Sequence, residues 1–178
     1  WRGPDWIVVE GESAILIECR ASRLVLRGKA TADENAIRDD VSAKLLPVIR
    51  HFPEKTTHIR EHPEVWPELR GVKRFYPVIV TYDTWWPAQP FHEIIDRELA
   101  AAGIRCDPYH IISIDALEAL MPLAATGIQI SKLLQKRIDR GQQGFFMDVT
   151  EEAKQAANIS ANKALIAARD HFFESIGV

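Results

Sequence analysis

Two short apolar segments on either side of Gly11-Glu12 constrain the fold of this sequence more than any other feature. Residues 5–10 and 13–19 are rich in Ile and Val, and a glycine opens the two-residue connection between them. Glycine accepts the positive φ that such a tight connection requires, and strands joined in this way pair antiparallel. The sequence therefore predicts a β-hairpin at residues 5–19.

A helix is predicted to follow the hairpin. Thr31 and Glu34 match a capping box, in which side-chain oxygens accept the first free N–H groups of a helix. Four apolar residues then recur at helical spacing, namely Ile37, Val41, Leu45 and Ile49. A helix over residues 32–50, bent at Pro47, satisfies this pattern. Residues 52–71 combine proline, histidine and charge without a period, so a long loop is predicted there.

Two further strands and the helix between them predict a βαβ unit. Residues 75–82 form an apolar run in which Pro77 indicates a sheet edge or a bulge. A helix from Pro90 to Gly103 and a strand over residues 109–114 complete the unit, whose two strands are expected to lie parallel with a right-handed crossover.

The C-terminal part is predicted to be helical. Asp115 and Glu118 repeat the capping-box pattern. Helices are then expected over residues 128–140 and 150–173, with a break at residues 141–144.

These elements predict an α/β fold, in which a mixed central sheet made of the hairpin and the parallel βαβ unit is flanked by helices. The 178 residues, 47% of them hydrophobic, are enough for one domain. Residues 1–125 are expected to form the α/β core, and residues 126–178 to form helices that pack on it or extend it. Because the chain opens with Trp1 and soon becomes a strand, a preceding N-terminal portion is expected.

Composition narrows the function classes. The formal net charge of −3 gives no overall attraction to nucleic acid, so such binding requires a local basic patch. No segment reaches the roughly 18 apolar residues of a membrane span, and no secretory leader is visible. Cys19 and Cys106 lack metal-type spacing, and Cys19 is expected to pack as a small hydrophobic residue. A reducing, cytoplasmic location without membrane contact is therefore expected.

The hairpin register brings two carboxylates together. With the turn at residues 11 and 12, the numbers of cross-strand partners add up to 23, so Asp5 lies opposite Glu18. Arg20 shares the face of Glu18, because side chains alternate with period two. Five residues are expected to point to the other, apolar face: Trp6, Val8, Ile15, Ile17 and Cys19.

Such a pair requires a nearby cation. Directly opposed like charges cost a sheet up to about 1 kcal/mol. Arg20 can supply the positive charge, and so can a divalent metal, because two carboxylates with a backbone carbonyl and waters form a shell that Mg²⁺ accepts. Both alternatives remain open from the residues alone.

Pro4-Asp5, a short spacer and Glu18-Cys19-Arg20 after an apolar strand together resemble the signature of the PD-(D/E)xK nuclease superfamily. The resemblance covers about residues 4–114 and implies a restriction-endonuclease-like fold. It also implies a Mg²⁺ or Mn²⁺ site held by Asp5, Glu18 and the carbonyl of Cys19, with Asp5, Glu18 and Arg20 as catalytic residues. The implied activity is hydrolysis of phosphodiesters in nucleic acid, with DNA favoured and a homodimer among the expected states.

One residue departs from this signature and others extend it. Arg20 stands where the superfamily has lysine, and an arginine with a pKa above about 12 holds a phosphate but is a poor general base. Arg20, Arg23, Arg27 and Lys29 occur with no acid between them, which predicts a phosphate-binding patch. A nucleic-acid-binding module without catalysis is therefore the second hypothesis.

Other candidates carry less weight. The histidines and glutamates of residues 51–64 match no standard zinc spacing and are expected on the surface. Trp85-Trp86 indicates a base-stacking or partner surface or, more simply, packing against the sheet, and an interaction domain of a larger protein is the third hypothesis. The basic residues of 132–140 are typical of a solvated helix face.

Overall fold

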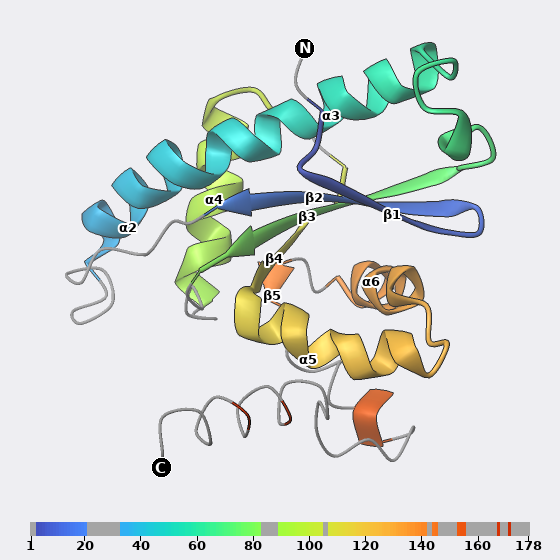
Figure 1. The fold of residues 1–178 in the computed structure, drawn as a ribbon. Coiled ribbons are helices and arrows are strands. Elements are labelled where there is room, and N and C mark those ends of the chain that lie inside the picture. Colours follow the sequence, from blue (N-terminus) through green and yellow to red (C-terminus); the bar gives the residue numbers. More distant parts are fainter. Residues whose placement is uncertain are drawn as a thin grey trace.

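A computed structural model describes residues 3–20, 33–82, 89–104, 107–141, 144–145, 153–155, 167 and 171. In this part of the chain, a five-stranded sheet has the order β1-β2-β3-β4-β5. Helices cover both faces of the sheet, α2, α3 and α4 on one side and α5 and α6 on the other (Figure 1). The predicted α/β class and the helical layers are confirmed.

The N-terminal hairpin is confirmed together with its register. Strands β1 (Trp6–Glu10) and β2 (Ser13–Arg20) pair antiparallel, with Trp6 opposite Ile17 and Val9 opposite Ala14. Gly11 has a φ of 62°, the left-handed conformation that glycine accepts without strain. The two-residue turn thus fixes which side chains of β1 and β2 meet.

The other strands are parallel to β2. Strand β3 (Arg74–Thr81) pairs with β2 and with β4 (His110–Ser113), which in turn pairs with β5 (Gly144–Phe145). The predicted mixed sheet and parallel βαβ unit are confirmed. Pro77 lies where β3 pairs with β2 alone, because pairing with β4 begins at Val78. Strand β5 was not predicted, since two residues are too few to show a period.

The predicted loop over residues 52–71 is wrong for its first half. Helix α2 (Glu34–Asp40) continues through a π-helical turn (Val41–Leu45) into α3 (Leu46–Glu61). Pro47 lies just after the π-helical turn, so the hydrogen bond that its missing N–H removes falls at this irregular stretch of the helix. The helix runs past Pro53 because Phe52, Thr56 and Ile59 are buried along one face. A short 3-10 turn (Pro67–Leu69) then leads to β3.

The two predicted capping boxes are each misplaced by two residues. Asp33 caps α2 by accepting two backbone N–H groups of the first turn, while Thr31 lies outside the described residues. Ser113, and not Asp115, caps α5 (Ile114–Ala125). In each case the capping residue directly precedes the helix, where its extended backbone aims the side-chain oxygen at the free N–H groups.

The remaining described helices follow the prediction closely. Helix α4 (Gln89–Ala101) is followed by Gly103 with a φ of 65°. Helix α6 (Ile130–Asp139) falls within predicted residues 128–140. Most of residues 150–173 lie outside the described part of the chain.

Two apolar layers enclose the sheet. On one face, Leu16, Ile79 and Ile111 pack with residues of α2, α3 and α4. On the other face, nine residues are buried with α5 and α6, namely Ile15, Tyr76, Val78, Val80, Ile112, Leu120, Leu123, Leu133 and Leu134. Helix α6 thus shares a core with the sheet.

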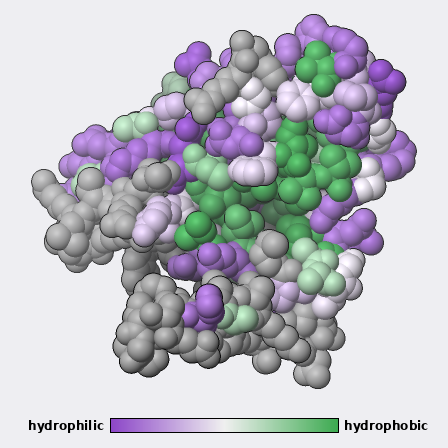
Figure 2. Space-filling view, in the orientation of Figure 1, coloured by the Kyte–Doolittle hydropathy of each residue, from purple (hydrophilic) through white to green (hydrophobic). Residues whose placement is uncertain are grey.

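The apolar face predicted for the hairpin is only partly buried. Ile15 is buried, but Trp6, Val8 and Cys19 are exposed, which corrects the expectation that they pack inward. In the view of Figure 1, α5 and α6 lie below the sheet, and β1 is left at its edge. Figure 2, in the same orientation, shows hydrophobic residues gathered around the middle of the visible face of the molecule. The alternation of apolar residues along β1 and β2 shows which side chains share a face, but it does not show how far the helices extend over that face.

Glu10 fastens the hairpin to α6. Its two carboxylate oxygens accept the N–H groups of Ile130 and Ser131 at 3.0 and 2.7 Å. We expect Glu10→Gln to lower the free energy of unfolding by about 1 kcal/mol, because a charged cap at a helix N-terminus is lost. Urea unfolding measures this change. The exposed Glu12→Gln is the control, and an equal loss in both variants would contradict the capping role.

Candidate functional site

The candidate site lies at the open end of the hairpin. The observed register, continued one residue beyond Trp6 and Ile17, sets Asp5 opposite Glu18 as predicted. Asp5 is exposed, whereas Glu18 is only 4% exposed. Glu18 shares a sheet face with Leu16 and therefore points toward α3.

A lysine from α3 meets Glu18. The Lys55 ammonium donates to Glu18 Oε1 and, at 3.1 Å, to the backbone carbonyl oxygen of Gly3. Arg20 approaches the other carboxylate oxygen, Oε2, at 3.5 Å. Both oxygens of this nearly buried carboxylate therefore face cations, as a buried charge requires.

Asp5 is held differently. Its Oδ2 accepts the backbone N–H of Cys19 at 2.8 Å, which orients the carboxylate at the hairpin end. Partial burial raises the pKa of the Cys19 thiol, and the charges of Asp5 and Glu18 raise it further, while Arg20 acts in the opposite direction. The two carboxylates therefore affect the Cys19 thiol more than Arg20 does.

The structure brings together some predicted site residues and leaves others undecided. Asp5, Glu18, Cys19 and Arg20 do lie at one end of β1 and β2. Arg20 ends β2 with its side chain 44% exposed, and among the described residues its ion pair is with Glu18. The three other members of the predicted phosphate patch lie outside the described residues: Arg23, Arg27 and Lys29.

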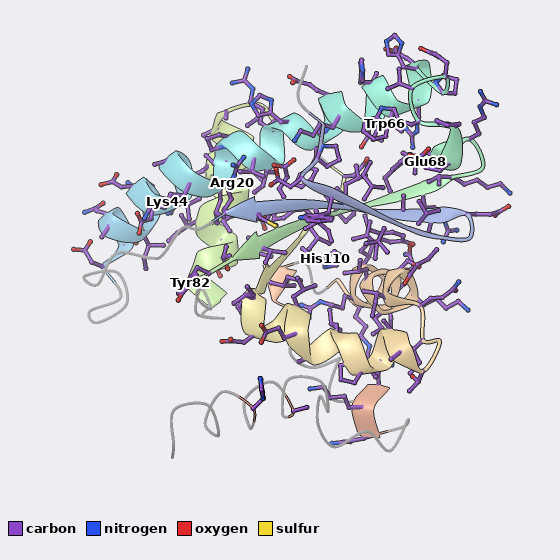
Figure 3. All side chains as sticks on the ribbon, viewed as in Figure 1. Arg20, Lys44, Trp66, Glu68, Tyr82 and His110 are labelled. Atoms are coloured by element: carbon purple, nitrogen blue, oxygen red, sulfur yellow. The ribbon has the colours of Figure 1, made fainter. Side chains whose placement is uncertain are left out.

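Lys55 is the site residue that the sequence analysis missed. Lys55 falls within the segment predicted as a loop, and a loop prediction assigns its side chains to no face of a helix or strand. The signal was available, because Ile49, Phe52, Thr56 and Ile59 continue the helical spacing across Pro53. Figure 3 shows that Arg20 and Lys44 lie on the same side of the molecule, where β2 ends and α2 leads into α3. Lys44 itself is paired with the buried Asp40 at 2.5 Å.

The other candidates form no metal centre. His51 bonds Glu54 at 3.0 Å and His62 bonds Glu64 at 3.1 Å, on separate turns. Within the described ranges, no group of three or more His, Cys, Asp or Glu side chains is arranged around a common point. Trp85 and Trp86 fall in the gap between residues 82 and 89.

A histidine and an arginine are buried in the layer below the sheet. His110 of β4 is fully buried, and Arg137 of α6 is only 3% exposed. This corrects the expectation that the basic residues of α6 all lie on a solvated face. Burial, and then the charge of Arg137, lower the pKa of His110 to about 3. His110 is therefore neutral at physiological pH.

Comparisons of the chain with known proteins assign no family to it. No protein-family profile, curated protein or solved structure matches the chain. The helices in the described part of the chain are all too short or too polar to cross a membrane.

Proposed function

We propose that this chain is a metal-dependent phosphodiesterase that acts on nucleic acid, with a restriction-endonuclease-like core. The observation that carries the proposal is the Lys55 ammonium bound to Glu18 beside Asp5. The motif lacks its lysine at Arg20, and Lys55 brings an ammonium to the same carboxylate from α3. The two carboxylates and the lysine expected of such a site are then present, the lysine coming from another element.

The oxygens at this site suit a hard cation. The Lys55 ammonium is bound by a carboxylate oxygen and a carbonyl oxygen, the donor types that Mg²⁺ and Mn²⁺ prefer. Two carboxylates are sufficient for Mg²⁺, because this ion keeps several of its waters. Asp5 and Glu18 would hold the ion, and the Cys19 carbonyl would complete the protein ligands. When bound, the ion neutralises charge on a phosphodiester and lowers the pKa of a coordinated water.

The side chains of the protein have separate roles in this proposal. Asp5, oriented by the Cys19 N–H, and Glu18 bind the metal. Lys55, on a flexible four-carbon stem, moves from Glu18 to the phosphate and stabilises its negative charge. Arg20, which is 44% exposed, binds a neighbouring phosphate through its forked guanidinium. Arg23, Arg27 and Lys29 extend this phosphate contact along the nucleic acid, with DNA favoured.

A second candidate is a nucleic-acid-binding module without catalysis. One observation favours it, namely that both oxygens of Glu18 already face Lys55 and Arg20 while the carboxylate is nearly buried. In this hypothesis Lys55 permanently takes the place of the metal, and Arg20 and the basic segment after it hold phosphates.

Metal binding separates the two candidates. By calorimetry with MnCl₂ and MgCl₂ we expect one divalent site per chain, weakened at least about tenfold by Asp5→Asn or Glu18→Gln, because each change removes a charged ligand. Glu12→Gln is the matched control, since Glu12 is an exposed carboxylate at the other end of the same hairpin.

Cleavage is then assayed on labelled single- and double-stranded DNA and RNA with Mn²⁺. Product formation that is lost in Asp5→Asn and kept in Glu12→Gln supports the phosphodiesterase. Retained binding of labelled DNA, with neither metal binding nor cleavage by the unaltered chain, would support the second candidate in its place.

A further inference from the structure

A small pocket lies at the opposite end of the sheet from Asp5 and Glu18. Its volume is about 120 Å³, and it forms where the end of α3 and the following turn meet the start of β3. Phe75 in its wall pairs with Ala14, four residues along β2 from Glu18. At strand spacing this is about 13 Å, so the pocket is separate from the candidate metal site.

Most of the residues that line the pocket are apolar or aromatic, and two are arginines. Ile59, Leu69 and Val72 contribute aliphatic side chains, and both Ile59 and Leu69 are buried in the core. Trp66 and Phe75 contribute two aromatic rings. Figure 3 shows Trp66 between α3 and the segment that leads to β3. Such a lining binds the face of a flat, apolar ring better than it binds water.

The rim carries two arginines that have no carboxylate partner among the described residues. The guanidinium of Arg60 lies 5.2 Å from the centroid of the Phe75 ring, and Arg70 Nε donates to the Pro63 carbonyl at 3.3 Å. Both side chains are exposed, so most of their N–H donors face solvent. Two cations held at the mouth of an apolar pocket form a receptor for an anion that is attached to a ring.

The acids on the segment between Arg60 and Arg70 do not line the pocket, although Glu64 lies close enough to Arg70 to feel its charge. The pKa of Glu64 is lowered first by a hydrogen bond with its own backbone, and then by His62 and Arg70. Its carboxylate already bonds His62 at 3.1 Å and does not line the pocket. Glu68 is exposed and also lies outside the lining.

We propose that this pocket binds one nucleotide, with the base against the Trp66 ring and the phosphate on Arg60 and Arg70. The volume of about 120 Å³ is small, which favours a single base over a larger ligand. Stacking of a base on an aromatic side chain contributes about 1–3 kcal/mol, and the arginines add a charge-assisted contact. The inference is independent of the proposed phosphodiesterase, because it uses none of the same residues.

The indole N–H signal of Trp66 in a ¹H–¹⁵N spectrum tests the pocket, with Trp66→Phe identifying the signal. We expect adenosine 5′-monophosphate to shift it saturably with a Kd of about 1 mM or lower. Adenosine alone and inorganic phosphate alone should bind at least about tenfold more weakly, because each lacks half of the contacts. The double variant R60Q/R70Q should weaken the mononucleotide by a similar factor.

The matched control is Arg74→Gln, an exposed arginine that does not line the pocket. The natural ligand can be a free nucleotide or an unpaired nucleotide within a strand, and a single-stranded oligodeoxyadenylate in the same titration distinguishes them. If the pocket binds a nucleotide within a strand, the oligodeoxyadenylate should bind more tightly than the mononucleotide. If the pocket binds a free nucleotide, it should not. No shift of the Trp66 signal at about 10 mM mononucleotide, or an unchanged Kd in R60Q/R70Q, overturns the proposal. If the calorimetric titration with MnCl₂ and MgCl₂ shows no metal binding, the proposed phosphodiesterase fails, but the Trp66 titration still tests the nucleotide pocket.

Discussion

Lys55→Met is expected to lower the free energy of unfolding by about 3 kcal/mol at neutral pH, because it leaves the charge of Glu18 buried without its closest partner. The side chains of Glu18 and Lys55 are only 5% and 12% exposed. Arg20 remains at 3.5 Å but is 44% exposed, so water screens it and it compensates weakly. Denaturant unfolding at pH 7 measures the loss.

A double variant shows whether the loss comes from the charge pair. In Lys55→Met/Glu18→Gln neither member of this pair remains as a buried charge, so most of the lost stability should return. Lys73→Met is the matched control, since Lys73 pairs with Glu12 at 2.6 Å while both side chains are well exposed. That variant should change stability by less than about 0.5 kcal/mol. A double variant no more stable than Lys55→Met would contradict the assigned coupling.

The second large effect is a loss of stability in acid that depends on His110. Its folded-state pKa, lowered by burial and by Arg137 to about 3, lies below the ordinary value of 6.5. As the pH falls below 6.5 the unfolded chain binds a proton there and the folded chain does not, so stability falls until the pH reaches about 3. The effect of this one group is about 2 kcal/mol between pH 7.5 and 5, and about 5 kcal/mol over the whole window.

The comparison variant is His110→Gln, which cannot titrate. Urea unfolding at pH 7.5 and pH 5 should show that the variant loses about 2 kcal/mol less than the unaltered protein over this interval, whatever its stability at pH 7.5. His51→Gln, which removes an exposed histidine of α3, is the control for the loss of one imidazole at a site that is not buried. Equal pH dependence in His110→Gln and the unaltered protein would mean that His110 does titrate near its ordinary pKa.

Local rules predicted the parts of the site that depend on neighbouring residues. Gly11 at a two-residue turn determined the register of β1 and β2, and the register placed Asp5 opposite Glu18. The same local rules predicted β3, α4 and β4, because apolar runs, Pro90 and Gly103 mark their limits. A two-residue strand such as β5 carries no such signal.

Predictions from neighbouring residues were wrong where packing against distant parts of the chain determined the structure. Proline, histidine and charge in residues 52–61 argued against a helix, yet the contacts of Phe52 and Ile59 with the core hold α3 together. Conversely, the alternation in β1 predicted an inward-facing Trp6, which is 68% exposed because none of the described helices covers the edge of the sheet there. Both errors concern packing partners that are distant in sequence.

The sequence by itself determined the hairpin, its register and the carboxylate pair of Asp5 and Glu18, since a tight turn and a period of two leave one arrangement. Only the tertiary structure decided that Lys55, 37 residues beyond Glu18, meets this carboxylate. The rotation and position of α3 on the sheet follow from the fit of its apolar face into the core, and this fit depends on residues from several strands and helices at once. No local pattern contains that information.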